Sequence, residues 1–97
     1  MKLNSKQRAF LRSEAQTMNP VVNVGKEGLT DGVVEHLNAA LESHELVKVR
    51  FQNSKDQVME ISRALEEKTG SVIVATTGFT TVFFRQDEKD PERIYII

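Results

Sequence analysis

The chain has 97 residues, of which 39% are hydrophobic, enough for one small domain with its own core. Thirteen Lys and Arg against 14 Asp and Glu give a net charge of −1, which argues against a strongly basic nucleic-acid binder. Cysteine is absent, so disulfides and thiolate metal sites are excluded, and no apolar run approaches the ~20 residues of a membrane span; we therefore expect a cytoplasmic protein.

The charges are unevenly distributed along the chain. Four basic residues precede the first acid, Glu14; they are Lys2, Lys6, Arg8 and Arg12. Between positions 87 and 92, four acids surround one lysine. No apolar segment follows the N-terminal charges, so we expect no signal peptide.

The first expected element is a helix from about residue 5 to residue 17. Asn4 or Ser5 is a suitable N-cap, and apolar residues recur along the segment at helical spacing. Pro20 ends the helix, because proline lacks an N–H group and disfavours helical geometry in the residue before it.

A short strand, a glycine loop and a second helix are expected next. Residues 21–24 are apolar enough for a strand, and Gly25-Lys26-Glu27-Gly28 follows as a loop. Thr30 is a good N-cap for a helix that begins there, and apolar residues recur from Val33 at core-packing spacing. Two glycines allow the backbone to pass close to a ligand, and a helix N-terminus attracts anions. The loop is therefore a candidate phosphate site.

Residues 46–51 alternate between apolar and basic, which predicts a strand with Val47, Val49 and Phe51 on one face and Lys48 and Arg50 on the other.

A third helix and two strands complete the expected elements. The capping box Ser54-Lys55-Asp56-Gln57 opens the helix, and Gly70 ends it. Residues 71–76 and 79–85 then read as a hairpin joined at Thr77-Gly78. Residues 86–92 are expected to form an acidic loop, and residues 93–97 either an edge strand or a tail.

The expected fold is therefore a single compact α/β domain with the order α-β-α-β-α-β-β. Each helix between strands should make a right-handed crossover to a parallel neighbour, and the last two strands should be antiparallel. The result is a four-stranded mixed sheet with helices on at least one face.

Catalysis is not indicated by any motif. The spacing G-x-x-x-x-G-K-[ST] of a nucleotide-binding P-loop is absent, and His36 and His44 have no ligand or base partners at functional spacing. We therefore expect no enzyme, no cofactor, no metal, no membrane and no small-molecule substrate. Phe51 and at least one of Phe83 and Phe84 should lie in the core, whereas stacking of a base on an exposed phenylalanine stays open.

Several segments together resemble the CRM (chloroplast RNA splicing and ribosome maturation) domain, in its stand-alone bacterial YhbY-like form. The matching segments are Leu11-Arg12, Ala15, Asn19-Pro20-Val21, Val24-Gly25-Lys26-Glu27-Gly28-Leu29-Thr30 and His44-Glu45-Leu46-Val47-Lys48-Val49. The resemblance covers about residues 3–85, which leaves residues 86–97 as acidic loop and tail. It implies an RNA-binding domain with a fold like the C-terminal domain of translation initiation factor three.

The resemblance also implies a function and a site. Bacterial members are linked to ribosomal RNA in precursors of the large ribosomal subunit and to their assembly. The implied clamp for the RNA backbone is the loop, and basic residues elsewhere would extend it; the predicted RNA-binding residues are Gly25, Lys26, Glu27, Gly28, Lys6, Arg8, Arg12, Lys48 and Arg50. Glu27 departs from this chemistry, because an acid repels phosphate.

Two alternatives to RNA binding stay open. One is a protein-interaction module that uses a sheet edge and the acidic segment from Asp87 to Glu92. The other is an enzyme that uses the glycine loop for a small phosphorylated substrate.

Overall fold

The computed structural model describes residues 2–86 and Tyr95. Its helices are α1 (Ser5–Ala15), α2 (Asp31–His44) and α3 (Lys55–Thr69), and its strands are β1 (Val22–Val24), β2 (Leu46–Phe51), β3 (Val72–Thr77) and β4 (Thr80–Phe84). The predicted order of helices and strands is confirmed, with small differences at the boundaries. The predictions for residues 87–97 lie outside the described residues, apart from Tyr95. Within the described part, no helix is long and apolar enough to cross a membrane.

The helix ends follow the local sequence signals. Asn4 is the N-cap of α1 and forms a capping box, in which Gln7 N–H donates to Asn4 Oδ1 at 2.8 Å and Asn4 N–H donates to Gln7 Oε1 at 3.0 Å. Ser54 and Gln57 form the predicted capping box of α3. Gly70 ends α3 with a φ of 66°, a backbone conformation that glycine adopts at little cost.

The four strands form one sheet in the order β1-β2-β4-β3. Strand β1 is parallel to β2, whereas β4 is antiparallel to both β2 and β3. The expectation that each crossover helix gives a parallel neighbour is therefore right for α2 and wrong for α3, because β4 lies between β2 and β3. Four of the five residues of β4 are buried, whereas those of β3 are mostly half-buried. The strand in the central position is thus the more buried of the two.

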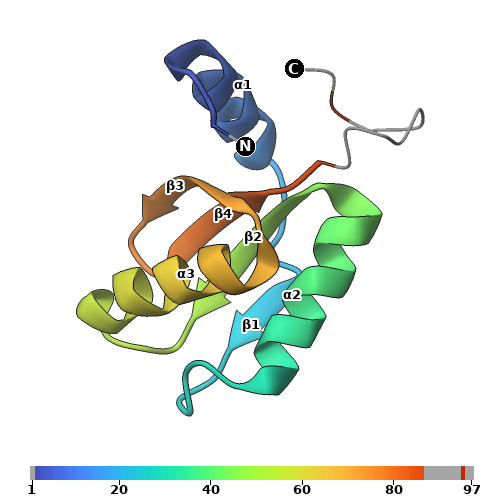
Figure 1. Cartoon of the computed structure of the whole chain (residues 1–97). Helices are drawn as coiled ribbons and strands as arrows, with labels where there is room; N and C mark the ends of the chain where they lie inside the picture. Colours follow the sequence, from blue (N-terminus) through green and yellow to red (C-terminus); the bar gives the residue numbers. More distant parts are fainter. Residues whose placement is uncertain (1, 87–94, 96–97) are drawn as a thin grey trace.

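Helices cover both faces of the sheet (Figure 1). Helices α2 and α3 lie on one face and enclose the larger core, to which β2 contributes Val47, Val49 and Phe51 as predicted. This core also contains Leu37 of α2, Leu65 of α3 and Phe83 of β4, each fully buried.

Helix α1 lies on the other face and buries a smaller cluster. Its Leu11 and Ala15 pack with Leu46 of β2 and with Val82 and Phe84 of β4. Phe84 also meets Tyr95 in an edge-to-face contact, with ring centroids 6.1 Å apart. Because α1 has only 11 residues, this cluster occupies one end of the sheet face. The other end of that face becomes the candidate site.

Candidate nucleic-acid interface

Side chains on the α1 face of the sheet form three rows across the strands, because residues paired in register point to the same face. The row under α1 consists of Leu46 of β2, Phe84 of β4 and Val72 of β3. The next row consists of Lys48, Val82 and Ala75 on the same three strands. The last row also includes β1 and consists of Asn23, Arg50, Thr80 and Thr77. Exposure increases along the strands, from the buried Leu46 to the half-buried Lys48 and the exposed Arg50. The last row is therefore polar and lies beyond the cover of α1; together with Lys48 of the neighbouring row and Arg12 of α1 it forms the surface that we call the basic strip.

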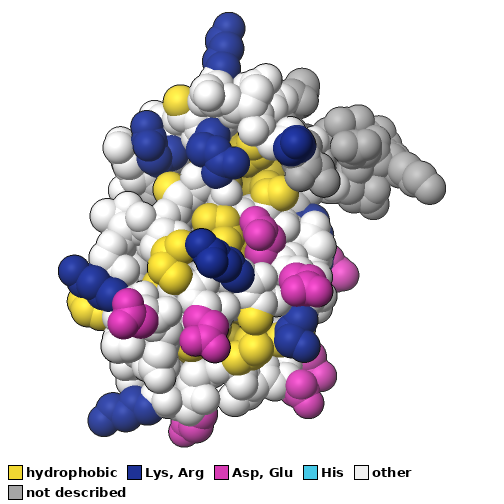
Figure 2. All heavy atoms as spheres, turned by 60° about the vertical axis from the view of Figure 1, so that its left-hand side comes forward, with side chains coloured by type: hydrophobic (Ala, Val, Ile, Leu, Met, Phe, Trp, Pro, Cys, Tyr) yellow, Lys and Arg dark blue, Asp and Glu magenta, His cyan; other side chains and the backbone are white. Residues whose placement is uncertain are grey.

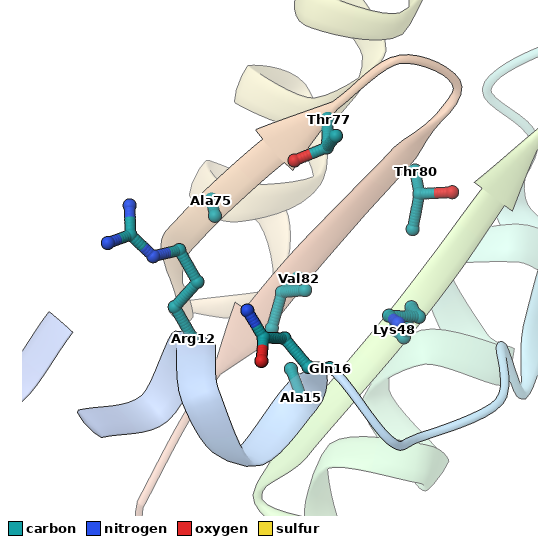
Figure 3. Close-up of a pocket in the computed structure, with 8 residues that line it drawn as sticks. All are labelled: Arg12, Ala15, Gln16, Lys48, Ala75, Thr77, Thr80 and Val82. Atoms are coloured by element: carbon teal, nitrogen blue, oxygen red, sulfur yellow. The ribbon is translucent and has the colours of Figure 1, made fainter. Parts of the chain in front are cut away.

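An open hollow of about 360 Å³ lies where α1 ends over this face (Figure 3). Its lining residues come from α1 and three strands: Arg12, Ala15, Gln16, Lys48, Ala75, Thr77, Thr80 and Val82. Figure 3 shows Arg12 on one side, Lys48 on the other and the Gln16 side chain between them. The lining holds two cations and no acid, so it favours an anionic ligand.

Lys48 is less free than its sequence position implied. Its Nζ donates a hydrogen bond to the backbone carbonyl of Met18 at 3.1 Å, and the residue is half-buried. Lys48 thus holds the segment between α1 and β1 against the sheet while its charge stays at the edge of the hollow. Arg50, two residues further along β2, is exposed and lies beyond the cover of α1.

Arg8 and Arg12 lie one turn apart on α1 but differ in what they contact. The Arg8 guanidinium donates from one nitrogen to the carbonyls of Ile73 at 2.6 Å and Val74 at 3.0 Å, where β3 is irregular in its pairing with β4. Arg8 therefore binds the free edge of β3. Arg12 and Lys6 are exposed, and Arg12 extends beside the hollow.

The glycine loop connects β1 to α2 and forms a tight turn. Gly28 N–H donates to the carbonyl of Gly25 at 3.0 Å, and Gly28 is buried with a φ of 76°. A Cβ on Gly28 would meet the Ile61 side chain at 3.4 Å, an ordinary contact, so it is the positive φ that favours glycine here. Among the described residues, no backbone partner is found for the N–H groups of Lys26 and Glu27. These two amides are therefore available as donors to a ligand.

The orientation of the Glu27 side chain bears on whether the loop can hold phosphate, because an acid repels phosphate. Its Oε2 atom lies 2.9 Å from the place that a Cβ on Gly25 would occupy, so the carboxylate folds back over the start of the loop. Glu27 is exposed and can rotate away at little cost. In the observed position it adds negative charge next to Gly25.

Asn53 holds the glycine loop through a side-chain hydrogen bond, a role that the sequence did not predict. Its Nδ2 donates to the Gly25 carbonyl at 3.1 Å, and the neighbouring Gln52 N–H donates to the Val24 carbonyl at 3.0 Å. Asn53 is only 8% exposed, and its Oδ1 has no hydrogen-bond partner among the described residues. The one sequence signal was an Asn directly before the capping box of α3.

The loop end of the molecule has a mixed charge. The carboxyl ends of β1 and β2 and the N-termini of α2 and α3 meet there (Figure 1), an arrangement that often binds ligands in α/β folds. Lys26 and Lys55 are each followed directly by an acid, Glu27 and Asp56, and Asp31 begins α2. In Figure 2, dark blue side chains gather over the upper part, where α1 lies, and mix with magenta ones below. The positive charge that has fewer acids beside it thus lies near α1 and the hollow.

Comparison with known proteins gives a family match over most of the chain. The model of the CRS1 / YhbY (CRM) domain matches residues 3–85. "Probable RNA-binding protein YqeI" of Bacillus subtilis is 34% identical over 91 residues, covering 93% of this chain and 95% of that protein. An "RNA-binding protein" of Haemophilus influenzae is 36% identical over 88 residues, covering 90% of this chain and 89% of its own.

A solved structure has the same fold. The solution structure of SAV1595 from Staphylococcus aureus matches with a TM-score of 0.81 and 32% sequence identity, over 95% of this chain and 97% of that one. The predicted resemblance and the predicted α/β fold are both confirmed by these matches.

Proposed function

The chain belongs to the CRS1 / YhbY (CRM) domain family, and from this premise we propose that it is an RNA-binding protein without enzymatic activity. Its two bacterial relatives named above are described as RNA-binding proteins. We further propose that the target is ribosomal RNA in a pre-large-subunit particle and that the protein assists assembly of that subunit, as the family resemblance suggests. We also propose that it acts in the cytoplasm.

The observation that carries this proposal is the basic strip beyond α1. Arg12, Lys48 and Arg50 lie along one partly uncovered sheet face, and the hollow between α1 and the strands contains no acid. A bound RNA strand would place phosphates along this strip and reach the amides of Lys26 and Glu27 beyond β1. Such contacts hold the backbone of RNA and read little sequence.

The strength of binding follows from the number of cations. For a single strand, three phosphate contacts give a slope of about −2 in a plot of log affinity against log salt. A protein with so few contacts binds naked RNA modestly, which suits a factor that associates with a particle and then leaves.

The protein-interaction alternative is less favoured by the edges of the sheet. Strand β1 has three residues, and Arg8 already occupies two carbonyls of β3. Short or blocked edges disfavour the addition of a strand from a partner. The acidic segment of that alternative lies outside the described residues.

The small-substrate alternative requires donors that converge on a pocket beside Gly25. The hollow of Figure 3 is instead lined by α1 and three strands, without a contribution from the loop. An open hollow beside a strip of polar side chains fits an extended chain better than a small molecule.

Crosslinking in cells, followed by sequencing of the bound RNA, tests the target. We expect enrichment of large-subunit ribosomal RNA precursors over messenger RNA. Enrichment spread evenly over cellular RNA would contradict the assembly role and leave general RNA binding in place.

The matched variants Arg50→Ala and Arg63→Ala test the surface, because both remove one exposed arginine. Arg63 lies on α3, which packs on the opposite face of the sheet from the strip. We expect Arg50→Ala to weaken RNA binding several-fold at low salt and to reduce the salt slope by about 0.7. Arg63→Ala should change neither. Equal effects of the two variants would show that only overall charge matters.

A further inference from the structure

Phe79 is an exposed aromatic residue at the turn between β3 and β4. The turn has two residues, Gly78 and Phe79, because Thr77 pairs directly with Thr80. Hairpin turns of this length usually take Gly with Asn, Asp or Ser. Phe79 is 47% exposed and belongs to neither core cluster. A lone exposed apolar residue is common on proteins, so the inference depends on its surroundings.

A backbone hydrogen bond fixes the turn at Phe79, and a cation lies near its ring. Phe51 N–H donates to the Phe79 carbonyl at 2.8 Å, and Gly78 adopts a φ of 59°, as the first turn position requires. The ammonium group of Lys55 lies over the ring, 5.9 Å from its centroid. Phe79 thus offers a positioned aromatic surface with a positive charge beside it.

The turn lies at the end of the sheet where the strip ends, and its ring lies on the α3 side of that end. Thr80 follows Phe79 directly and pairs in register with Arg50. Lys55 is the first residue of α3, so the turn and the α3 N-terminus lie side by side (Figure 1). Because neighbouring residues of a strand face opposite ways, Thr80 faces the strip and Phe79 faces Lys55 of α3. An RNA strand that follows Arg50 would therefore pass round the end of the sheet to reach the ring.

We propose that Phe79 and Lys55 form a binding site for one unpaired nucleotide of RNA. The base stacks on the Phe79 ring, and Lys55 and Arg50 contact the flanking phosphates. A base inside a duplex has both faces covered by its neighbours, so the site selects single-stranded RNA or an unpaired bulge. This inference rests on the proposed RNA binding and adds the conformation of RNA that the protein prefers.

Substitutions of Phe79 test the role of the ring. Loss of one stacked base weakens single-strand binding by about tenfold, because base–aromatic stacking of 1–3 kcal/mol corresponds to that order of affinity. We expect this loss for Phe79→Ala and for Phe79→Leu, which keeps an apolar side chain without a ring. Phe79→Tyr should bind as the unchanged protein does, and the affinity for a blunt RNA duplex of equal length should change little in all three.

The matched control is Phe10→Ala. Phe10 is 45% exposed, nearly the same as Phe79, and lies on α1 away from the turn. We expect this variant to keep its affinity for the single strand. A loss equal to that of Phe79→Ala would overturn the site by showing that any exposed ring contributes.

A tryptophan probe gives a direct reading of stacking. The chain contains no tryptophan, so Phe79→Trp carries a single indole fluorophore. Titration with a single-stranded oligoadenylate should quench its emission, and titration with the duplex should not.

Two negative outcomes separate this site from the proposed function. Tight single-strand binding by Phe79→Ala and Phe79→Leu, or unchanged emission of Phe79→Trp while RNA binds, overturns the nucleotide site and leaves RNA binding intact. Failure of the unchanged protein to bind either RNA at low salt overturns both.

Discussion

The two faces of the sheet differ in how fully helices cover them. On the α2 and α3 side, the large side chains of Leu37, Leu65 and Phe83 are fully buried. On the α1 side, cover ends midway, and the strand β2 passes from the buried Leu46 to the exposed Arg50. The closed face supplies most of the core, and the half-open face supplies the candidate binding surface.

Simple dimensions explain the difference. A strand of six residues such as β2 is about 20 Å long, at about 3.3 Å per residue. One helix with its side chains is about 10 Å across, so a helix that lies over one end of the strands covers about half of their length. A single α1 helix therefore leaves room for a ligand without any separate cavity.

The largest expected effect is a loss of folding stability when a core side chain on the α2 and α3 side of the sheet is removed. Phe83→Ala should lower the free energy of unfolding by about 3–5 kcal/mol, because it leaves a cavity in a fully buried site. Arg50→Ala should change it by less than about 0.5 kcal/mol, because the side chain is exposed. Denaturant unfolding monitored by circular dichroism measures both. Similar losses in the two variants would contradict the division between the faces.

An intermediate effect separates the two arginines of α1. Arg8→Ala removes two hydrogen bonds to β3 and should lower the free energy of unfolding by about 1 kcal/mol, with little effect on RNA affinity. Arg12→Ala should weaken RNA binding and leave the free energy of unfolding nearly unchanged, because Arg12 is exposed and borders the hollow. Thermal unfolding and RNA titration of both variants decide this, and a swapped pattern would remove Arg12 from the interface.

The smallest effect concerns the loop. Glu27→Gln removes the carboxylate that folds over Gly25, so RNA affinity should rise by about two- to fivefold at low salt. The gain should shrink as salt screens the charge. Titrations at two salt concentrations measure it, with Glu67→Gln on α3 as the matched control. A decrease in affinity would mean that Glu27 assists binding.

Local signals predicted most of the fold. The capping residues Asn4 and Ser54, the stop at Gly70 and the alternation of β2 each depend on neighbours in sequence, and each is confirmed. The insertion of β4 between β2 and β3 was missed, because the place of a strand depends on burial of both its faces by distant elements.

The candidate site was only partly predictable for the same reason. Charge and spacing singled out the loop and the basic residues. The contact of Arg8 with β3 joins residues 65 positions apart in sequence, and that of Asn53 with Gly25 joins residues 28 apart. Such contacts leave no local pattern. The row from Asn23 to Thr77 likewise required the register of all four strands.

Nuclear magnetic resonance mapping tests the central claim, that RNA lies on the half-open face. Backbone amide shifts of the isotope-labelled protein would be recorded during titration with a single-stranded RNA. We predict changes at Asn23, Arg50, Thr80 and the turn at Phe79, and none on the outer surface of α2. Changes confined to α2 and α3, with the strip unaffected, would contradict the account.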